Sequence, residues 1–155
     1  MLQRRGAQYK TLLRVRKTQE ELKAQALAEA RHRRQTAEGQ RAELMAQRAQ
    51  LLSEAGERAK GAFDPRLVRL YYQHERHIRH QIDDKDASIR GLAEAEEERR
   101  QELEGAMKER RLVERLIERW EEEYRAEVNK DLQALSDEVA SSRAAIARLD
   151  EKRTR

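Results

Sequence analysis

Three histidines in one short segment are the side chains of this chain that most resemble a metal site. His74, His77 and His80 recur at three-residue intervals in the segment LYYQHERHIRHQI. On a helix, each three-residue step turns by about 60° from the last position, so the three imidazoles would not converge on one ion. The sequence also has no cysteine and no His-Glu-x-x-His pattern. We therefore interpret the histidines as polar residues on a helix surface.

Carboxylate runs and phosphate-binding loops are the other features that would point to catalysis. Glu96, Glu97 and Glu98 are consecutive, but a charge run on a helix is normally a solvated face. Two packed helices also offer no pocket that would desolvate a general acid or base. No Gly-x-x-x-x-Gly-Lys-Ser/Thr loop is present. The sequence predicts a protein that is not an enzyme, with no catalytic residue, no cofactor and no metal ligand.

Composition indicates which elements carry these residues. The 155 residues are 41% charged, 37% hydrophobic and 4% aromatic, which is too polar for an ordinary globular core. One proline and six glycines stand among strong helix formers, so we expect long helices packed along narrow seams. The absence of cysteine fits a reducing compartment, and we expect neither a cleaved secretion signal nor insertion in a membrane. We therefore predict a cytoplasmic protein.

The segment GAFDP predicts the point at which the chain turns. Gly61 suits the left-handed conformation just past a helix end. Asp64 suits the N-cap of the next helix, and Pro65 suits its first position. Phe63 is spaced to pack on Val68 as a hydrophobic staple. The unusual residues of this segment are therefore explained by folding and need no catalytic role.

These signals predict an all-α fold, a long two-helix antiparallel coiled-coil hairpin with a longer C-terminal helix. We expect one coiled-coil domain over residues 1–155, with helices at about 2–60 and 65–152 and a turn at about 61–64. Helices joined by so short a connection normally lie antiparallel. Residue i of the first helix should then face roughly residue 125 minus i.

Heptad spacing predicts the seam along which the helices pack. Five of the sixteen seam positions in the second helix are charged, which weakens the centre of the seam. These positions are Tyr71, Glu75, Ile78, Ile82, Lys85, Ile89, Leu92, Glu96, Arg99, Leu103, Ala106, Arg110, Val113, Ile117, Trp120 and Tyr124. In the first helix we expect Leu12, Val15, Leu22 and Ala26, then a phase change of one residue to Ala30, Ala37, Leu44 and Leu51.

An apolar stripe continues past the end of the predicted pairing. By the pairing rule Leu2 faces about residue 123, so the residues after Tyr124 should project beyond the first helix. An isolated helix gains most of its stability by packing such a face, so we expect the stripe to dock on another protein or another copy. The stripe consists of Val128, Leu132, Leu135, Val139, Ile146 and Leu149.

Charge is distributed unequally along the chain. Residues 1–60 carry 14 Lys+Arg and 7 Asp+Glu, whereas residues 61–155 carry 20 and 23. The basic half could attract the acidic half, an acidic protein or a nucleic acid. Its helix offers only Tyr9 for base stacking, and acidic residues interrupt the arginines. We therefore expect no nucleic-acid partner.

The last 50 or so residues contain KERRLVERLIERWEEEYRAEV followed by DLQALSDEVASSR, which includes Leu135, Asp137, Glu138, Val139 and Ala140. These segments resemble the family of the flagellar export protein FliJ, whose final motif these five residues match. The segment LYYQHERHIRHQI is also similar to the aromatic-rich start of the family's second helix. Two features depart from the family pattern: Ser136 interrupts the usual hydrophobic-Asp-Glu order, and histidines replace aromatic residues near the turn.

The resemblance implies a component of the flagellar type III export apparatus, peripheral at the cytoplasmic face of the flagellar base. The open end of the hairpin would insert into the export ATPase ring and promote its activity, and the hairpin would contact the cytosolic domain of the export gate FlhA and handle export chaperones. ATPase contacts would come from Leu12, Leu13, Arg16, Leu132, Leu135, Asp137, Glu138 and Val139. Gate contacts would come from Gln40, Leu44, Gln47, Leu51, Tyr71, His74, Ile78 and Gln81, unless the seam buries them.

Three alternatives stay open at this point. The chain could be the equivalent stalk of a virulence type III injectisome, which neighbouring genes would distinguish. It could be a structural coiled coil that homo-oligomerises through the stripe and forms a stable dimer. It could also be a nucleic-acid-binding coiled coil, which predicts strongly salt-dependent binding to RNA.

Overall fold

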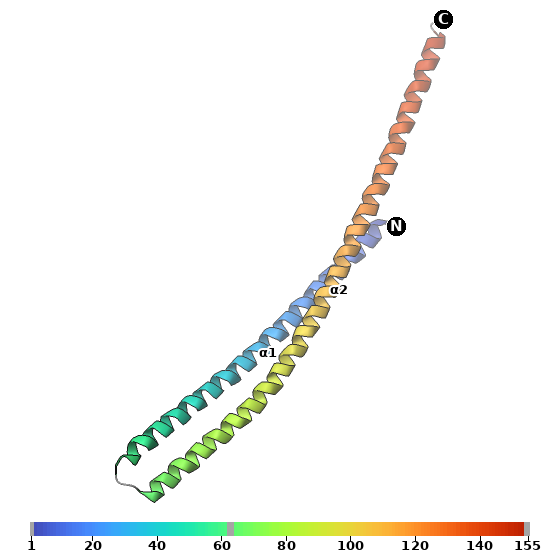
Figure 1. Ribbon diagram of the computed structural model, residues 1–155. Helices are drawn as coiled ribbons and strands as arrows, with labels where there is room; N and C mark the ends of the chain where they lie inside the picture. The colour runs from blue at the N-terminus through green and yellow to red at the C-terminus, as the bar shows by residue number, and fades with distance from the viewer. Residues whose placement is uncertain (1, 62–63, 154–155) are drawn as a thin grey trace. The chain divides into compact units, whose positions relative to one another are not determined.

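The computed structural model describes residues 2–61 and 64–153, and these form two long helices. Helix α1 runs Leu2–Ala59 and helix α2 runs Pro65–Arg153 (Figure 1). The described residues include no strand, so the fold is all-α as predicted. The helices pack antiparallel in the predicted register, because Arg16 pairs with Glu109 and Lys23 pairs with Glu102. None of the described helices is long and apolar enough to cross a membrane.

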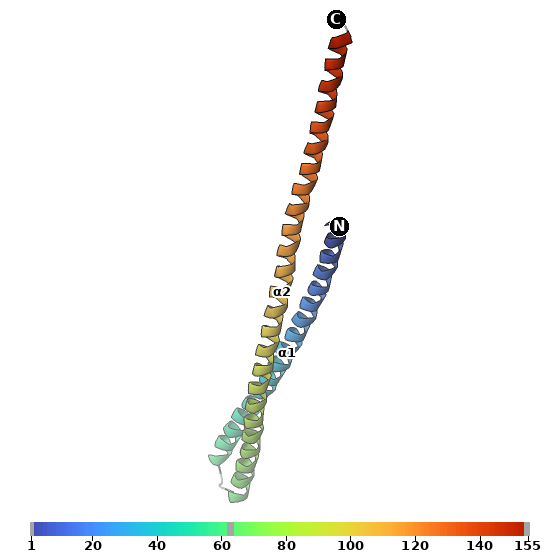
Figure 2. The same cartoon turned by 90° about the vertical axis from the view of Figure 1, so that its right-hand side faces the viewer.

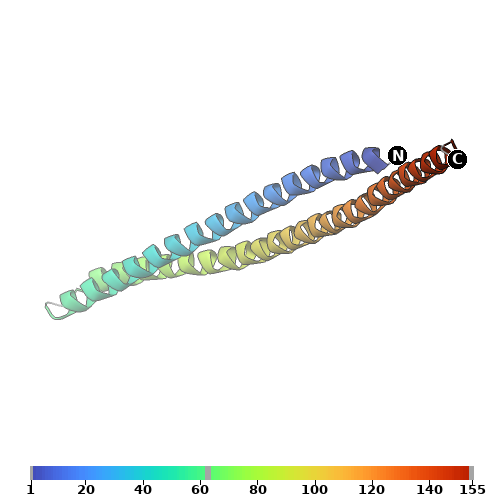
Figure 3. The same cartoon turned by 90° about the horizontal axis from the view of Figure 1, so that it is seen from above.

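Contacts divide the chain into two compact units. Unit 1 consists of residues 1–18 and 108–155, and unit 2 consists of residues 19–107, so each unit contains a stretch of both helices. Within unit 1, α2 continues beyond the start of α1 (Figure 2). In unit 2, α1 and α2 cross in the view from above, as expected of helices that wind around each other (Figure 3). The single domain over residues 1–155 stays a prediction.

Helix α2 begins with the predicted cap. The carboxylate of Asp64 accepts a hydrogen bond of 2.9 Å from the backbone N–H of Arg66. The backbone carbonyl of Asp64 accepts another, of 3.1 Å, from the N–H of Val68. Pro65 occupies the first helical position, where its missing N–H costs no hydrogen bond. The predicted contact of Phe63 with Val68 lies outside the described residues.

Helix α1 ends differently from the prediction. Among the described glycines none has a positive φ, so Gly61 is not the left-handed residue that the sequence predicted. Instead, the N–H groups of Lys60 and Gly61 donate to the carbonyls of Glu57 and Arg58, at 3.3 and 3.2 Å. These bonds reach back three residues and tighten the last turn. They satisfy its carbonyls without a left-handed cap.

The predicted seam of α2 is confirmed. Fifteen of its sixteen positions are buried or half-buried, and only Arg99 is exposed. In unit 2, Leu51, Ile78 and Ile82 form a buried cluster near the turn, with Leu44 and Tyr71 packed against it. We call these five residues the turn-end cluster.

The predicted seam of α1 is wrong at three N-terminal positions, whereas the other five are buried or half-buried as predicted: Ala26, Ala30, Ala37, Leu44 and Leu51. Leu12, Val15 and Leu22 are 37%, 47% and 59% exposed. The side chains that pack towards α2 lie one position later in the sequence, and several of them are charged. The hydrocarbon parts of long Arg and Lys side chains can pack in a seam while their charged ends reach carboxylates. Once these residues are counted, the seam of α1 keeps one heptad register, so the predicted phase change is absent. The buried or half-buried positions are Gly6, Tyr9, Leu13, Arg16, Glu20, Lys23, Ala26, Leu27, Ala30, Arg34, Ala37, Arg41, Leu44, Arg48, Leu51 and Ala55.

Candidate docking surfaces

The overhang stripe is an exposed apolar surface of unit 1, made of the six residues from Val128 to Leu149 predicted above. They are 37% to 63% exposed, and every residue from Arg125 to Leu149 is exposed. An α-helix with one apolar stripe is normally covered along that stripe. Within the described residues nothing covers this one, as the sequence predicted.

An aromatic pair marks the end of the pairing in unit 1. The rings of Trp120 and Tyr124 stack, with centroids 5.6 Å apart and planes at 22°. The backbone of Gly6 lies directly against Trp120, and a Cβ at this position would overlap ring atoms Cζ2 and Cη2. This close approach requires glycine. Heptad spacing predicted Trp120 and Tyr124 as seam positions but not Gly6, whose one signal in the sequence is that it is a glycine inside a predicted helix.

The predicted ATPase contacts on α2 are all exposed. Leu132, Leu135 and Val139 belong to the overhang stripe, and Asp137 and Glu138 are exposed beside it. This arrangement places an apolar stripe and two carboxylates on a helix that is free on all sides in the described part of the chain. Their role as partner contacts stays a prediction.

The predicted ATPase contacts on α1 differ in exposure. Leu12 is exposed, whereas Leu13 and Arg16 are half-buried in the seam. The guanidinium of Arg16 donates to the carboxylate of Glu109 at 2.6 Å. Arg16 therefore holds α1 against α2, and Leu12 is the one member of this group that is exposed.

The predicted gate contacts divide between core and surface. Leu51 and Ile78 are buried in the turn-end cluster, and Leu44 and Tyr71 pack against it. The remaining four residues are exposed, so only part of the predicted set is accessible. Three of these four line one shallow hollow of about 380 Å³ together with Leu44. The exposed residues are Gln40, Gln47, His74 and Gln81, of which all but His74 line the hollow.

A second hollow, which the sequence analysis missed, lies between the end of α1 and the start of α2 in unit 2. Its volume is about 470 Å³, and most of its lining is apolar. Leu52, Val68 and Tyr72 contribute exposed surface to it, at 51%, 46% and 68%. At the edge of this hollow, the guanidinium of Arg58 lies 6.0 Å from the centre of the Tyr71 ring. We call this surface the turn hollow.

Charged residues along the seam of unit 2 are paired both between the helices and within α2. Glu75 is 6% exposed and accepts hydrogen bonds of 2.8 Å from Arg48 of α1 and Arg79 of α2. Burial opposes the ionisation of Glu75, but the hydrogen bonds from Arg48 and Arg79 outweigh it, so the pKa of this carboxyl lies below its ordinary value. The hydrogen bonds from Lys23 and Arg99 lower the pKa of Glu102 in the same way.

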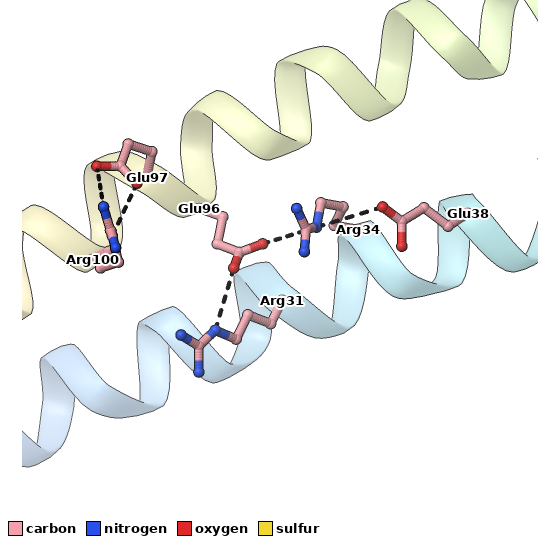
Figure 4. Close-up of polar contacts among 6 residues, drawn as sticks. All are labelled: Arg31, Arg34, Glu38, Glu96, Glu97 and Arg100. Atoms are coloured by element: carbon pink, nitrogen blue, oxygen red, sulfur yellow. Dashed lines mark hydrogen bonds and ion pairs between the residues drawn. The ribbon is translucent and has the colours of Figure 1, made fainter.

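One carboxylate joins two arginines of the facing helix. Glu96 accepts a hydrogen bond of 3.3 Å from Arg31 and forms an ion pair of 3.0 Å with Arg34 (Figure 4). Arg34 also reaches Glu38 on its own helix, at 3.7 Å. These contacts fix the register of the two helices at a place where the seam has few apolar residues. Sequence analysis identified Glu96 as a seam position but not its partners.

The histidines near the turn are exposed side chains. His74, His77 and His80 all lie on the surface of α2. Across residues 2–61 and 64–153, no three side chains of His, Cys, Asp or Glu gather in a way that could hold a metal ion.

Two long helices joined by interhelical ion pairs, with an apolar stripe left exposed in the described residues, define an all-α coiled-coil protein. The family model described as Flagellar FliJ protein matches residues 5–149, which is nearly the whole chain. The chain therefore belongs to the FliJ family, and it is a component of the flagellar type III export apparatus. No curated protein and no solved structure matches it.

Proposed function

We propose that this protein docks its overhang stripe into the ring of the export ATPase and promotes ATP hydrolysis. The observation that supports this role is the exposure of six aliphatic side chains on one face of unit 1. An amphipathic helix with such a face typically binds in an apolar groove of another protein. Asp137 and Glu138 beside the stripe would contact polar or basic groups at the rim of that groove.

Unit 2 would make a second contact of the protein, which is with the cytosolic domain of the export gate FlhA. The exposed residues Gln40, Gln47 and Gln81 line one hollow, and His74 lies on the same stretch of α2. The neighbouring turn hollow adds apolar surface. Leu51 and Ile78 would support this face from beneath and not touch the gate, because both are buried. Export chaperones would be further partners, and the protein would act at the cytoplasmic face of the flagellar base.

ATP hydrolysis by the cognate export ATPase, titrated with this protein, tests the proposed function. We expect saturable stimulation that added RNA does not reverse. No stimulation at any ratio of the two proteins would contradict the proposal. Loss of stimulation on adding RNA would favour a nucleic-acid-binding coiled coil instead.

A further inference from the structure

The overhang stripe has the residue pattern of a two-stranded coiled coil. With Ser142 included, its members follow one another at alternating four- and three-residue steps, which is a heptad repeat. Two of its three a positions are β-branched, and two of its four d positions are leucine. This combination favours parallel dimers. The a positions are Leu132, Val139 and Ile146, and the d positions are Val128, Leu135, Ser142 and Leu149.

We infer that the overhang stripe of one copy packs in register against the same stripe of a second copy, as a parallel two-stranded coiled coil over residues 128–149. Each of the seven layers would then pair a residue with itself. Six layers would be aliphatic, and one would pair Ser142 with Ser142 of the second copy.

The flanking charges favour the parallel arrangement. In a parallel pair, a g residue of one helix faces the e residue that lies five positions later in the other helix. Glu138 is at g and Arg143 is at e, so each dimer would contain two attractive pairs of these residues. An antiparallel pair sets a residues against d residues, so it can keep only six of the seven layers. One such register brings Glu138 against Glu138 of the second copy, where like charges are destabilising, and the other brings Glu138 against Ala145. Neither register contains the attractive pairs of Glu138 with Arg143.

Helix α1 leaves room for a second helix on the stripe. Its segment at Gly6 packs against Trp120, and every residue of α2 from Arg125 to Leu149 is exposed. The last seam position, Tyr124, is followed by Val128 and then Leu132 in two four-residue steps. Each such step moves the apolar position by about 40° around the helix axis. The stripe therefore turns away from the side that α1 occupies.

The contact is short, so the dimer should be weak. Residues 128–149 span about 33 Å at the rise of an α-helix, and one layer is polar. We expect a dissociation constant on the order of micromolar for so short a coiled coil. The dimer needs only this chain. Under the proposed function it would compete with the ATPase ring for the same stripe and keep the stripe covered until docking.

The absence of cysteine from the chain allows a direct test in the isolated protein. Ser142→Cys places a thiol at a d position, and Ser141→Cys is a matched control with the same substitution at the outward c position. We expect a disulfide-linked dimer to form at least about ten times faster with Ser142→Cys, because the coiled coil raises the effective concentration of its thiol. Equal rates for the two variants would overturn the proposal, whether the chains are monomeric or antiparallel.

Sedimentation of the full chain gives an independent measurement. The unmodified protein should show a concentration-dependent dimer at about tens of micromolar, which is above the expected dissociation constant. Leu135→Asp with Val139→Asp should remain a monomer. A monomer at all concentrations for the unmodified chain would contradict the inference. Neither experiment includes the ATPase, so failure here leaves the proposed function untouched, and failure of ATPase stimulation leaves the dimer untouched.

Discussion

Ile78 and Ile82 in unit 2 and Leu135 and Val139 in unit 1 are aliphatic residues at heptad positions of the same helix. The first two are 3% and 6% exposed, whereas the last two are 58% and 49% exposed. In unit 2, residues of α1 lie opposite Ile78 and Ile82. In unit 1, α1 does not extend along the overhang stripe, so no residue of α1 lies opposite Leu135 or Val139. A heptad pattern thus predicts that a face will be covered. What covers it depends on the length of the facing helix.

The largest expected effect comes from placing a charge in the turn-end cluster. Ile82→Asp should destabilise unit 2 by roughly 3–5 kcal/mol, because it removes a buried side chain and leaves a carboxylate without a partner. Thermal unfolding followed by circular dichroism measures the loss. Leu135→Asp, the matched change in the overhang stripe, should alter stability by only about 0.5 kcal/mol or less because the site is exposed. An equal loss of stability in the two variants would contradict the difference in burial between the turn-end cluster and the overhang stripe.

A smaller effect is expected where pairing ends in unit 1. Gly6→Ala should destabilise the contact with Trp120 by about 1–3 kcal/mol, because its Cβ overlaps the indole ring. Trp120 is the only tryptophan, so its fluorescence should shift to longer wavelength as the ring becomes more solvated. Gly39→Ala is the control in the same helix, since nothing lies within 4 Å of its new methyl group. An unchanged spectrum for Gly6→Ala would show that α1 does not pack on Trp120.

Acid should weaken unit 2 through its paired carboxylates. The folded-state pKa values of Glu75 and Glu102 lie below 4.5, so the ionised forms stabilise the fold fully above about pH 4.5. That stabilisation is lost as the pH falls through the folded-state values. The melting temperature should therefore drop below about pH 4.5. Glu75→Gln should lower the melting temperature at neutral pH and reduce its dependence on acid, and a dependence equal to that of the unmodified chain would argue against these pairs.

The smallest effect is expected at the Glu96 contact. Glu96→Gln should cost about 1 kcal/mol or less, because Arg31 and Arg34 stay partly solvated and can interact with water. The difference from the unmodified chain should shrink as salt is raised from about 0.05 to 0.5 M, since ions screen exposed pairs. A difference that does not change with salt would indicate a packing role for Glu96 instead.

Much of this fold could be predicted from single residues with clear conformational preferences. Asp64 and Pro65 marked the start of α2, and the aliphatic and aromatic seam positions marked its buried face. The N-terminal part of the α1 seam could not be predicted from apolar residues, because charged residues such as Arg16 and Lys23 occupy several of its positions. The close approach of Gly6 to Trp120 is a tertiary contact that no local pattern encodes.

The candidate surfaces were predicted unequally for the same reason. The overhang stripe was identified because its apolar spacing continued past the expected pairing. The turn hollow was missed, since it is formed by side chains from both helices, such as Leu52 and Tyr72, that are far apart in sequence. Leu51 and Ile78 were predicted as gate contacts but belong to the core, because seam and surface residues alternate closely near the turn.

The most direct test of the central claim compares two double variants of the overhang. Leu135→Asp with Val139→Asp changes the stripe, whereas Ala134→Asp with Ala140→Asp adds the same charges at exposed positions off the stripe. Stimulation of the export ATPase and the helical circular-dichroism signal would be measured for both. We predict that the stripe variant loses stimulation while both variants keep their helical signal. Full stimulation by the stripe variant, or loss of its helical fold, would contradict the assignment of this surface to docking.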